Sequence, residues 1–220
     1  MKDILEADGI QLNINNKRIL SDIYIKCECG KLTVLVGRNG QGKSSLMQII
    51  FGTLSAEKSV RINHTSFNEA YKRPDLVRYL PQFNFIPKNL IISEIFKDYR
   101  IDFESFNSLF GEFKGKQNNK ISTLSLGERR IIELYIILRS ISKFILLDEP
   151  FIHLSPIQIQ KINNLIEGEI KGNKGIIITD HLYYLNNDII NITSFIYLLS
   201  NGKLYSVKDV REIEKWYTIK

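Results

Sequence analysis

The eight residues from Gly37 to Ser44 constrain this chain most, because they read Gly-Arg-Asn-Gly-Gln-Gly-Lys-Ser between two different apolar patterns. A strand-like run, Leu32–Val36, precedes them and a helical run, Leu46–Ile50, follows. Glycines at positions 37 and 42 let the backbone pass close to an anion, so that its N–H groups can point at phosphate oxygens. The sequence therefore predicts a strand, a phosphate-binding loop and a helix, in that order.

The lysine and serine that end this loop predict nucleotide binding with a metal ion. Lys43 would reach the β- and γ-phosphates and Ser44 would ligate Mg²⁺, while the helix directs its positive end at the same anion. A glycine-rich turn formed by chance is the alternative, and the flanking strand and helix argue against it. The residues expected to bind nucleotide here are Gly37, Arg38, Asn39, Gly40, Gln41, Gly42, Lys43, Ser44 and Ser45.

Hydrophobic patterns elsewhere predict an α/β fold with a parallel sheet. Unbroken apolar runs at 144–147 and 175–179 are typical of central parallel strands, and the helical pattern at 156–170 predicts a βαβ crossover between them. The first thirty residues alternate apolar and polar positions around a turn at 15–17, which predicts antiparallel strands. Further strands are expected at 60–62, 77–80, 195–199 and 203–205, the last two joined by a turn at Asn201-Gly202.

The segment between residues 83 and 124 has an interrupted helical periodicity, with a loop-like stretch at 111–119. At 220 residues the chain has the length of one domain. We therefore expect a single domain over 1–220. Residues 1–82 and 125–220 would form a nucleotide-binding core with an N-terminal β subdomain, and 83–124 a helical insert.

Charge, cysteines and hydropathy limit the possible partners. The net charge is +6, but the basic residues are scattered and no nucleic-acid motif accompanies them, so we expect a solvated surface and no nucleic-acid partner. Cys27 and Cys29 lack neighbouring metal ligands and predict a reduced, packed pair. The sequence shows neither a signal peptide nor an apolar run long enough to span a membrane, which predicts a cytoplasmic protein.

Two carboxylates close the buried run at 144–147. At the carboxyl end of a central strand they would lie beside the phosphate loop, where ligands of open α/β sheets bind. Asp148 would hold Mg²⁺ through water, and Glu149 would act as general base on the attacking water. An acidic surface turn is the alternative, and the phosphate loop makes it the weaker one.

Two further polar side chains follow predicted strands. Gln82 follows the strand at 77–80 after Pro81, and its amide oxygen can ligate Mg²⁺. His181 follows the strand at 175–179, which favours contact with a γ-phosphate over a structural role. His64 and His153 have no such position.

The order of these motifs resembles the ATP-binding cassette (ABC) family, which has a RecA-like P-loop core, a phosphate loop, a glutamine loop, a signature sequence, a carboxylate strand and a histidine switch. Leu124-Ser125-Leu126-Gly127-Glu128 is similar to the signature sequence. The resemblance implies that Ser125, Gly127 and Glu128 contact the ATP of a second protomer, so that two cassettes enclose two ATP-Mg²⁺ head to tail. The run from Lys143 to Phe151 is similar to lipopolysaccharide-export and branched-chain amino-acid transporter ATPases.

Three positions depart from the family pattern. Leu126 stands where a glycine lets backbone approach phosphate, Ser155 stands where an aspartate couples the two sites, and Ile14 stands where an aromatic ring stacks on adenine. Together they predict slow ATP hydrolysis and poor discrimination of ATP from GTP.

The resemblance implies the ATPase subunit of a membrane transporter, working as a homodimer on integral membrane permease subunits and held at the inner face of the membrane through them. The alternative is a soluble ABC ATPase that acts as an ATP-driven clamp on a macromolecule. A small P-loop kinase or GTPase would share the loop at 37–44 but would not need Ser125, Gly127 or His181.

Overall fold

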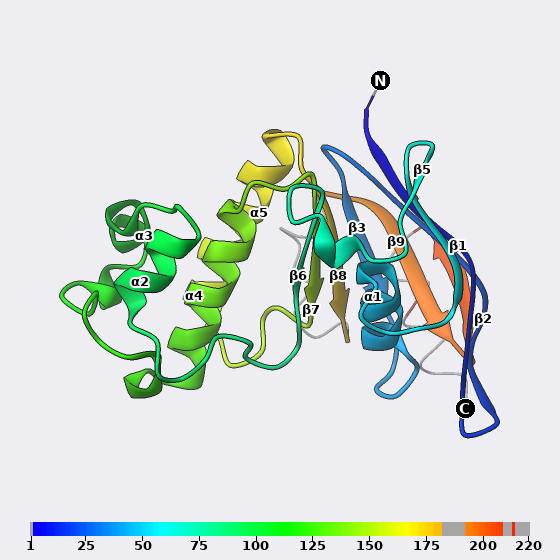
Figure 1. Cartoon of the computed structure of the whole chain (residues 1–220), viewed down its shortest axis with the longest axis horizontal. Coiled ribbons are helices and arrows are strands. Elements are labelled where there is room, and N and C mark those ends of the chain that lie inside the picture. Colours follow the sequence, from blue (N-terminus) through cyan, green and yellow to red (C-terminus); the bar gives the residue numbers. More distant parts are fainter. Residues whose placement is uncertain (1, 182–191, 209–212, 214–220) are drawn as a thin grey trace.

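The computed structural model describes residues 2–181, 192–208 and 213 of the chain. Within these residues the strands form an antiparallel sheet, in the order β2-β1-β4-β5, and a mostly parallel sheet, in the order β10-β9-β3-β8-β7-β6 (Figure 1). The apolar side chains pack into two clusters, one on each face of the parallel sheet. The buried strands predicted from unbroken apolar runs therefore form the middle layer of the molecule.

The antiparallel sheet follows from the alternating pattern of the first residues. β1 (Ile4–Ile14) and β2 (Lys17–Glu28) pair through the turn Asn15-Asn16, whose φ values of 48° and 60° suit a type I′ hairpin. β4 (Glu57–Ile62) and the short β5 (Thr65–Ser66) complete it. The predicted strand at 60–62 thus begins three residues earlier, because its first half is too exposed to show an apolar signal.

The parallel sheet contains β3 (Leu32–Val36), β6 (Val77–Leu80), β7 (Phe144–Asp148), β8 (Gly175–Asp180) and β9 (Thr193–Ser200), with β10 (Lys203–Val207) antiparallel at its edge. Every residue of β3, β7 and β8 is buried, as expected for central parallel strands. Because parallel strands end at the same edge, the residues that follow β3, β6, β7 and β8 meet there.

Helices and the antiparallel sheet cover the two faces. α1 (Lys43–Phe51) and the antiparallel sheet pack on one face, and α4 (Leu126–Arg139) and α5 (Pro156–Lys171) on the other (Figure 1). Cys27 and Cys29 are free and buried in the first of these layers, as predicted. The site at the strand ends is therefore held between two packed layers.

The segment at 83–124 carries α2 (Ile92–Asp98) and α3 (Phe103–Leu109), which lie beyond α4 from the sheet (Figure 1). Single 3₁₀ turns stand at Ala70–Lys72, Gly111–Phe113 and Ile121–Thr123. The stretch expected to be a loop at 111–119 thus begins with a turn, because Phe113 is fully buried against Phe106. Aromatic packing that includes Tyr135 of α4 joins this segment to the rest of the molecule.

Candidate functional site

The phosphate loop lies between β3 and α1 and has the backbone that its glycines predict. Gly42 is the N-cap of α1, with φ 101°, and Gly40 has φ 77°, both in the left-handed region. A Cβ on Gly42 would lie 3.1 Å from side-chain atoms of Ile19 and Leu20. Position 42 thus requires glycine for both its conformation and the space around it. Because Gly42 has no side chain to cap α1, the backbone N–H groups at the start of this helix are left for an anion.

β9 and the turn between β9 and β10 contact the phosphate loop. A Cβ on Gly37 would lie 2.6 Å from the carbonyl oxygen of Leu199 in β9, so only glycine fits there. The backbone N–H of Asn201 donates to Oε1 of Gln41 at 2.8 Å. The side chain of Gln41 is therefore occupied by the β9–β10 turn, and its backbone N–H donates to the carbonyl of Arg38 at 3.3 Å within the loop.

Lys43 is 4% exposed and turns back onto its own loop. Its Nζ donates to the carbonyl oxygens of Gly37 at 2.7 Å and Arg38 at 3.3 Å. Burial lowers the pKa of the ammonium, and the carboxylates of Glu149, Asp148 and Asp180 oppose that shift. A polyphosphate would replace neutral carbonyls with anionic acceptors and so favour the charged lysine.

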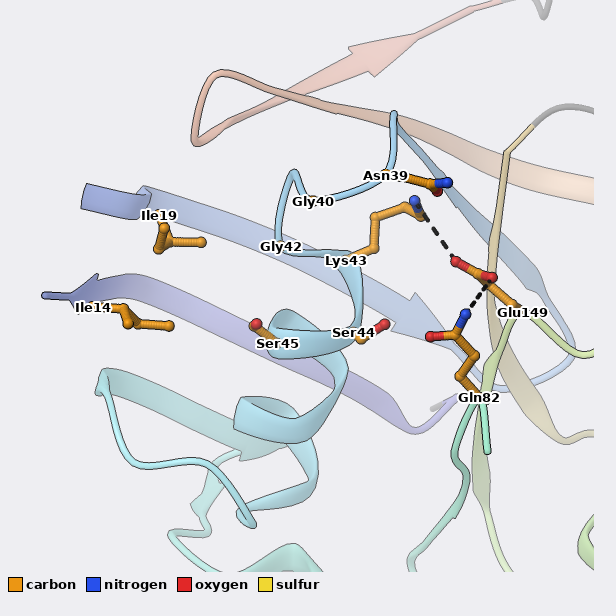
Figure 2. A pocket seen from close by; sticks show the side chains of 10 residues that line it. All are labelled: Ile14, Ile19, Asn39, Gly40, Gly42, Lys43, Ser44, Ser45, Gln82 and Glu149. Atoms are coloured by element: carbon orange, nitrogen blue, oxygen red, sulfur yellow. Dashed lines mark hydrogen bonds and ion pairs between the residues drawn. The ribbon is translucent and has the colours of Figure 1, made fainter. Parts of the chain in front are cut away.

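Glu149 and Gln82 meet Lys43 at the carboxyl ends of the strands (Figure 2), and His181 contacts both Glu149 and Lys43. Glu149 Oε1 lies 2.5 Å from His181 Nε2 and 4.0 Å from Lys43 Nζ, and Gln82 Nε2 donates to Glu149 Oε2 at 2.9 Å. His181 Nδ1 also lies 3.1 Å from Lys43 Nζ and 3.2 Å from the carbonyl oxygen of Gly37, so the imidazole touches the lysine, the loop backbone and the carboxylate together. The structure thus brings together the predicted base, lysine, glutamine and histidine.

Asp148 is the last residue of β7, directly before Glu149, and is 1% exposed. Its Oδ1 accepts from the Thr179 hydroxyl at 2.6 Å and its Oδ2 from the Tyr79 hydroxyl at 3.2 Å. Burial is the main reason that the pKa of Tyr79 is raised, so the phenol remains a donor. Hydroxyl donors therefore hold both oxygens of this carboxylate in place, and its predicted contact with a metal through water stays a prediction.

A pocket of about 400 Å³ opens over the loop, within the size range of small-molecule sites. Its lining is Ile14, Ile19, Asn39, Gly40, Gly42, Lys43, Ser44, Ser45, Gln82 and Glu149 (Figure 2). One end is apolar, formed by Ile14 and Ile19, and the other is polar. In Figure 2 the amide oxygen of Gln82 is turned toward the hydroxyl of Ser44, so two oxygen ligands suited to Mg²⁺ face each other.

The signature-like residues lie outside this pocket, at the start of α4. Ser125 is the N-cap, and Ser125 and Glu128 form a capping box in which each side chain bonds the other's backbone N–H. Glu128 also accepts from Lys116 Nζ at 2.5 Å. A Cβ on Gly127 would lie 2.5 Å from the carbonyl oxygen of His153, which gives this glycine a packing role. These residues therefore do not join the pocket of their own chain.

Several contributors were not predicted from the sequence. Ile19 lines the pocket because β2 runs beside the loop, which no local motif indicates. Arg130, fully buried in α4, donates to the backbone carbonyls of Asp148 and Glu149. In the sequence Arg130 follows two charged residues, Glu128 and Arg129, and comes just before the apolar helical run, so nothing local indicated its burial. Within the described residues there is no cluster of three or more side chains suited to a metal ion and no helix long and apolar enough to cross a membrane.

Residues 20–152 match the model of the family described as ABC transporter. An uncharacterized ABC transporter ATP-binding protein of Rhizobium meliloti is 30% identical over 191 residues, which cover 80% of this chain and 71% of that protein. The lipopolysaccharide export system ATP-binding protein LptB of Haemophilus influenzae is 26% identical, over 91% of this chain and 88% of its own.

Solved structures share the fold. One described as the ATP-binding subunit of an ABC transporter has a TM-score of 0.77 at 18% identity, covering 99% of this chain and 95% of that one. A nucleotide-free ATP-binding cassette from an ABC transporter has a TM-score of 0.75 at 20% identity, covering 98% and 94%. The predicted α/β class, with a P-loop core, an antiparallel sheet and added helices, is confirmed.

Proposed function

The chain belongs to the ABC transporter family, and from this premise we propose that it binds and hydrolyses ATP with Mg²⁺ as the ATP-binding subunit of a membrane transporter. One observation carries the proposal. Lys43, Gln82, Glu149 and His181 come from four separate segments and converge at the mouth of one phosphate loop. A loop that bound an anion for structural reasons alone would not need a carboxylate and an imidazole at this point.

The residues fit a nucleotide and its metal ion. The N–H groups of the loop and the start of α1 would bind the phosphates, and Lys43 would exchange its two carbonyl acceptors for phosphate oxygens. Bound Mg²⁺ would neutralise charge that develops on the phosphates. Ser44 and Gln82 would hold it directly and Asp148 through water.

Glu149 is the proposed general base. Its Oε1 accepts from His181 in this structure, so the imidazole keeps the carboxylate beside the position of the γ-phosphate. Glu149 would take the proton of the attacking water, and His181 would then contact the γ-phosphate. Loss of a positioned base costs about 10²- to 10⁴-fold in rate.

The start of α4 supports a head-to-tail homodimer. Ser125, Gly127 and Glu128 do not line their own chain's pocket, which leaves them for the ATP of a partner protomer. Closure around two ATP molecules and opening after hydrolysis would then drive integral membrane permease subunits, with the chain held at the cytoplasmic face through them. We propose no nucleic-acid partner.

The departures from the family pattern support slow turnover and weak base selectivity. Leu126 is 52% exposed at the first turn of α4, where it would face the partner's nucleotide. Ser155 caps α5 and brings no charge. At the apolar end of the pocket Ile14 offers no ring to stack on a base, a loss of roughly 1 to 3 kcal/mol. Competition between ATP and GTP for the pocket tests this, and strong preference for ATP would contradict it.

The Glu149→Gln variant tests the whole proposal, with Glu167→Gln on the exposed side of α5 as its matched control. With ATP and Mg²⁺, Glu149→Gln should bind ATP, lose hydrolysis and elute as a dimer in size-exclusion chromatography, while the control behaves as wild type. Membranes solubilised with ATP should then yield multi-span proteins with the trapped dimer. Recovery of soluble or ribosomal partners alone would favour the ATP-driven clamp, and failure to bind ATP would overturn the proposal.

A further inference from the structure

Two charged side chains of α4 are fully buried and take no part in the chemistry proposed above. Arg130 is 2% exposed and Glu133 is 0% exposed, and they lie one turn apart with Nη1 and Oε2 separated by 3.9 Å. Burial of charges is costly unless each is paired and its hydrogen bonds are satisfied. Their partners therefore indicate what the pair does.

Arg130 binds two loops with one guanidinium. Nη1 donates to the carbonyl of Pro81 at 2.7 Å, in the loop after β6. Nη2 donates to the carbonyls of Asp148 at 2.9 Å and Glu149 at 3.0 Å, and Nε to that of Pro150 at 3.1 Å, at the end of β7 and in the loop after it. Burial lowers the pKa of Arg130 to about 10, which leaves it charged at neutral pH. The planar donor fork thus fixes the chain on both sides of the candidate site.

Glu133 holds the continuation of the first loop. Its Oε1 accepts from the backbone N–H groups of Phe85 at 3.0 Å and Ile86 at 3.2 Å. Its Oε2 accepts from Asn84 Nδ2 at 2.9 Å. Gln82 therefore lies between a residue fixed by Arg130 and three fixed by Glu133.

These loops need such support. Glu149 has φ 46°, which is unfavourable for a residue with a Cβ and persists only where surrounding contacts impose it. Gln82 donates to the Glu149 carboxylate, so displacement of either loop separates the two side chains. A shift of about 1 Å in a reacting group can cost on the order of 10²-fold in rate.

We propose that Arg130 and Glu133 are positioning residues for hydrolysis: from α4 they hold the backbone of Glu149 and the loop of Gln82 in the geometry that hydrolysis requires. This rests on the function proposed above, in which Glu149 is the base. Figure 1 shows α4 between the sheet and the α2–α3 segment. Arg130 and Glu133 lie on this helix, and the same helix begins with the signature-like sequence.

The first test replaces Arg130 with lysine, which keeps the charge but lacks the planar fork that reaches four carbonyls. We expect kcat for ATP to fall about 10- to 100-fold and KM to change less than about threefold, because the hydrogen bonds of Arg130 described above go to residues 81 and 148–150, on the hydrolytic side of the site. Arg139→Lys is the matched control, since Arg139 lies on the same helix with its side chain 48% exposed and paired with Glu169. It should leave kcat and KM unchanged.

The second test uses Glu133→Ala and Glu133→Gln. Alanine leaves the N–H groups of Phe85 and Ile86 without their acceptor, so hydrogen exchange should become faster in the peptide at 83–90 and kcat should fall. Glutamine keeps one oxygen acceptor, and Asn84 can turn its amide to meet the new NH₂ group. We therefore expect Glu133→Gln to restore slow exchange and most of kcat.

The outcomes separate this inference from the proposed function. If the wild-type chain hydrolyses ATP and Arg130→Lys keeps kcat within twofold of Arg139→Lys, the inference is overturned. A fall in kcat matched by an equal rise in KM, or unchanged exchange at 83–90 in Glu133→Ala, overturns it as well. A wild-type chain that binds ATP without hydrolysing it contradicts the proposed function, and the exchange experiment then still decides whether the pair holds the loops.

Discussion

The helix that follows the phosphate loop and the helix that follows the signature-like sequence begin in opposite ways. α1 starts at Gly42, and within the described residues no side chain caps it. α4 starts with a complete capping box between Ser125 and Glu128. A bare helix start presents N–H groups and positive potential to an anion, whereas a capping box satisfies those groups internally. One chain therefore has one helix start arranged for a ligand and another arranged for its own stability.

The difference bears on how a second nucleotide could be bound. A phosphate that approached α4 would meet the carboxylate of Glu128, which already accepts from Ser125 and Lys116. The Ser125 oxygen accepts from the Glu128 N–H, but its own proton can still be donated outward. We therefore expect the contribution of α4 to a shared nucleotide site to be weaker than that of α1.

The largest effect is expected on the α1 side, from Lys43→Met. This substitution removes the ammonium group at the uncapped start of α1. ATP hydrolysis should fall on the order of 10²- to 10³-fold, as for loss of a hydrogen-bond donor that stabilises transition-state charge. The thermal midpoint should not fall, because burial already lowers the pKa of Lys43 and disfavours its charge. Lys58→Met, at a lysine that donates to the carbonyls of Ile49 and Asn68, is the control in an ATPase assay. Equal losses in both variants would refute a special role for Lys43.

The next effect comes from the conformation at the start of α1. Gly42→Ala adds a Cβ at φ 101°, where backbone strain costs about 1 to 3 kcal/mol and the side chains of Ile19 and Leu20 are 3.1 Å away. ATP affinity, measured by titration calorimetry, should fall about tenfold or more. Gly115→Ala imposes similar strain at φ 78° with nothing within 4 Å, so it should reduce stability and leave affinity unchanged. If Gly42→Ala and Gly115→Ala lost the same ATP affinity, backbone strain alone would explain the loss.

A smaller effect is expected from the capping serines. Ser125→Ala and Ser155→Ala each remove the N-cap of a capping box, and each should cost about 1 kcal/mol of unfolding free energy. Only Ser125→Ala should also lower ATP-dependent dimerisation, because Ser125 belongs to the signature-like sequence, whereas Ser155 already lacks the charge that couples the two sites in the family pattern. Urea unfolding and sedimentation measure the two properties. A loss of dimer in Ser155→Ala as large as in Ser125→Ala would erase the distinction.

The smallest effect concerns charge at the start of α4. Burial opposes ionisation of Glu128, but hydrogen bonds from Lys116 and Ser125 outweigh it and lower its pKa. Ionised Glu128 therefore contributes stability that is complete above its ordinary pKa of 4.5 and is lost as the pH falls through the lowered value. Glu128→Gln should be less stable by about 0.5 kcal/mol near pH 7 and equal to wild type in strong acid. A difference that persists at pH 2 would contradict this origin.

These two helix starts also show how far the sequence could be interpreted. The strand, loop and helix at 32–51 were predictable, because glycine and lysine positions in such a loop are fixed by the anion they surround. The capping box was predictable in principle from serine followed three residues later by glutamate. The resemblance to the family assigned Glu128 to a ligand. The sequence therefore did not predict that this side chain bonds within its own chain, to the backbone of Ser125 and to Lys116.

Most long-range contacts could not be predicted from the sequence, for a different reason. The meeting of Gln82, Glu149 and His181 follows from the ends of parallel strands, which periodicity predicts. Ile19 in the pocket and Thr179 on Asp148 depend on which strands lie side by side and in what register. Arg130 ends a charged triplet just before the apolar run of α4, so neither its burial nor its carbonyl partners at 81 and 148–150 have a local signal.

The contact of β9 with the phosphate loop has a consequence for synthesis of the chain. β3 lies between β8 and β9, and Leu199 and Asn201 brace the loop at Gly37 and Gln41. The ribosome makes Gln41 of the phosphate loop 160 residues before Asn201, which contacts it. A nascent chain that ends before β9 lacks one wall of the phosphate loop, so we expect ATP to bind only after this strand has been made. The emergence of this late strand from the ribosome would mark the moment at which the protein first becomes able to bind its substrate.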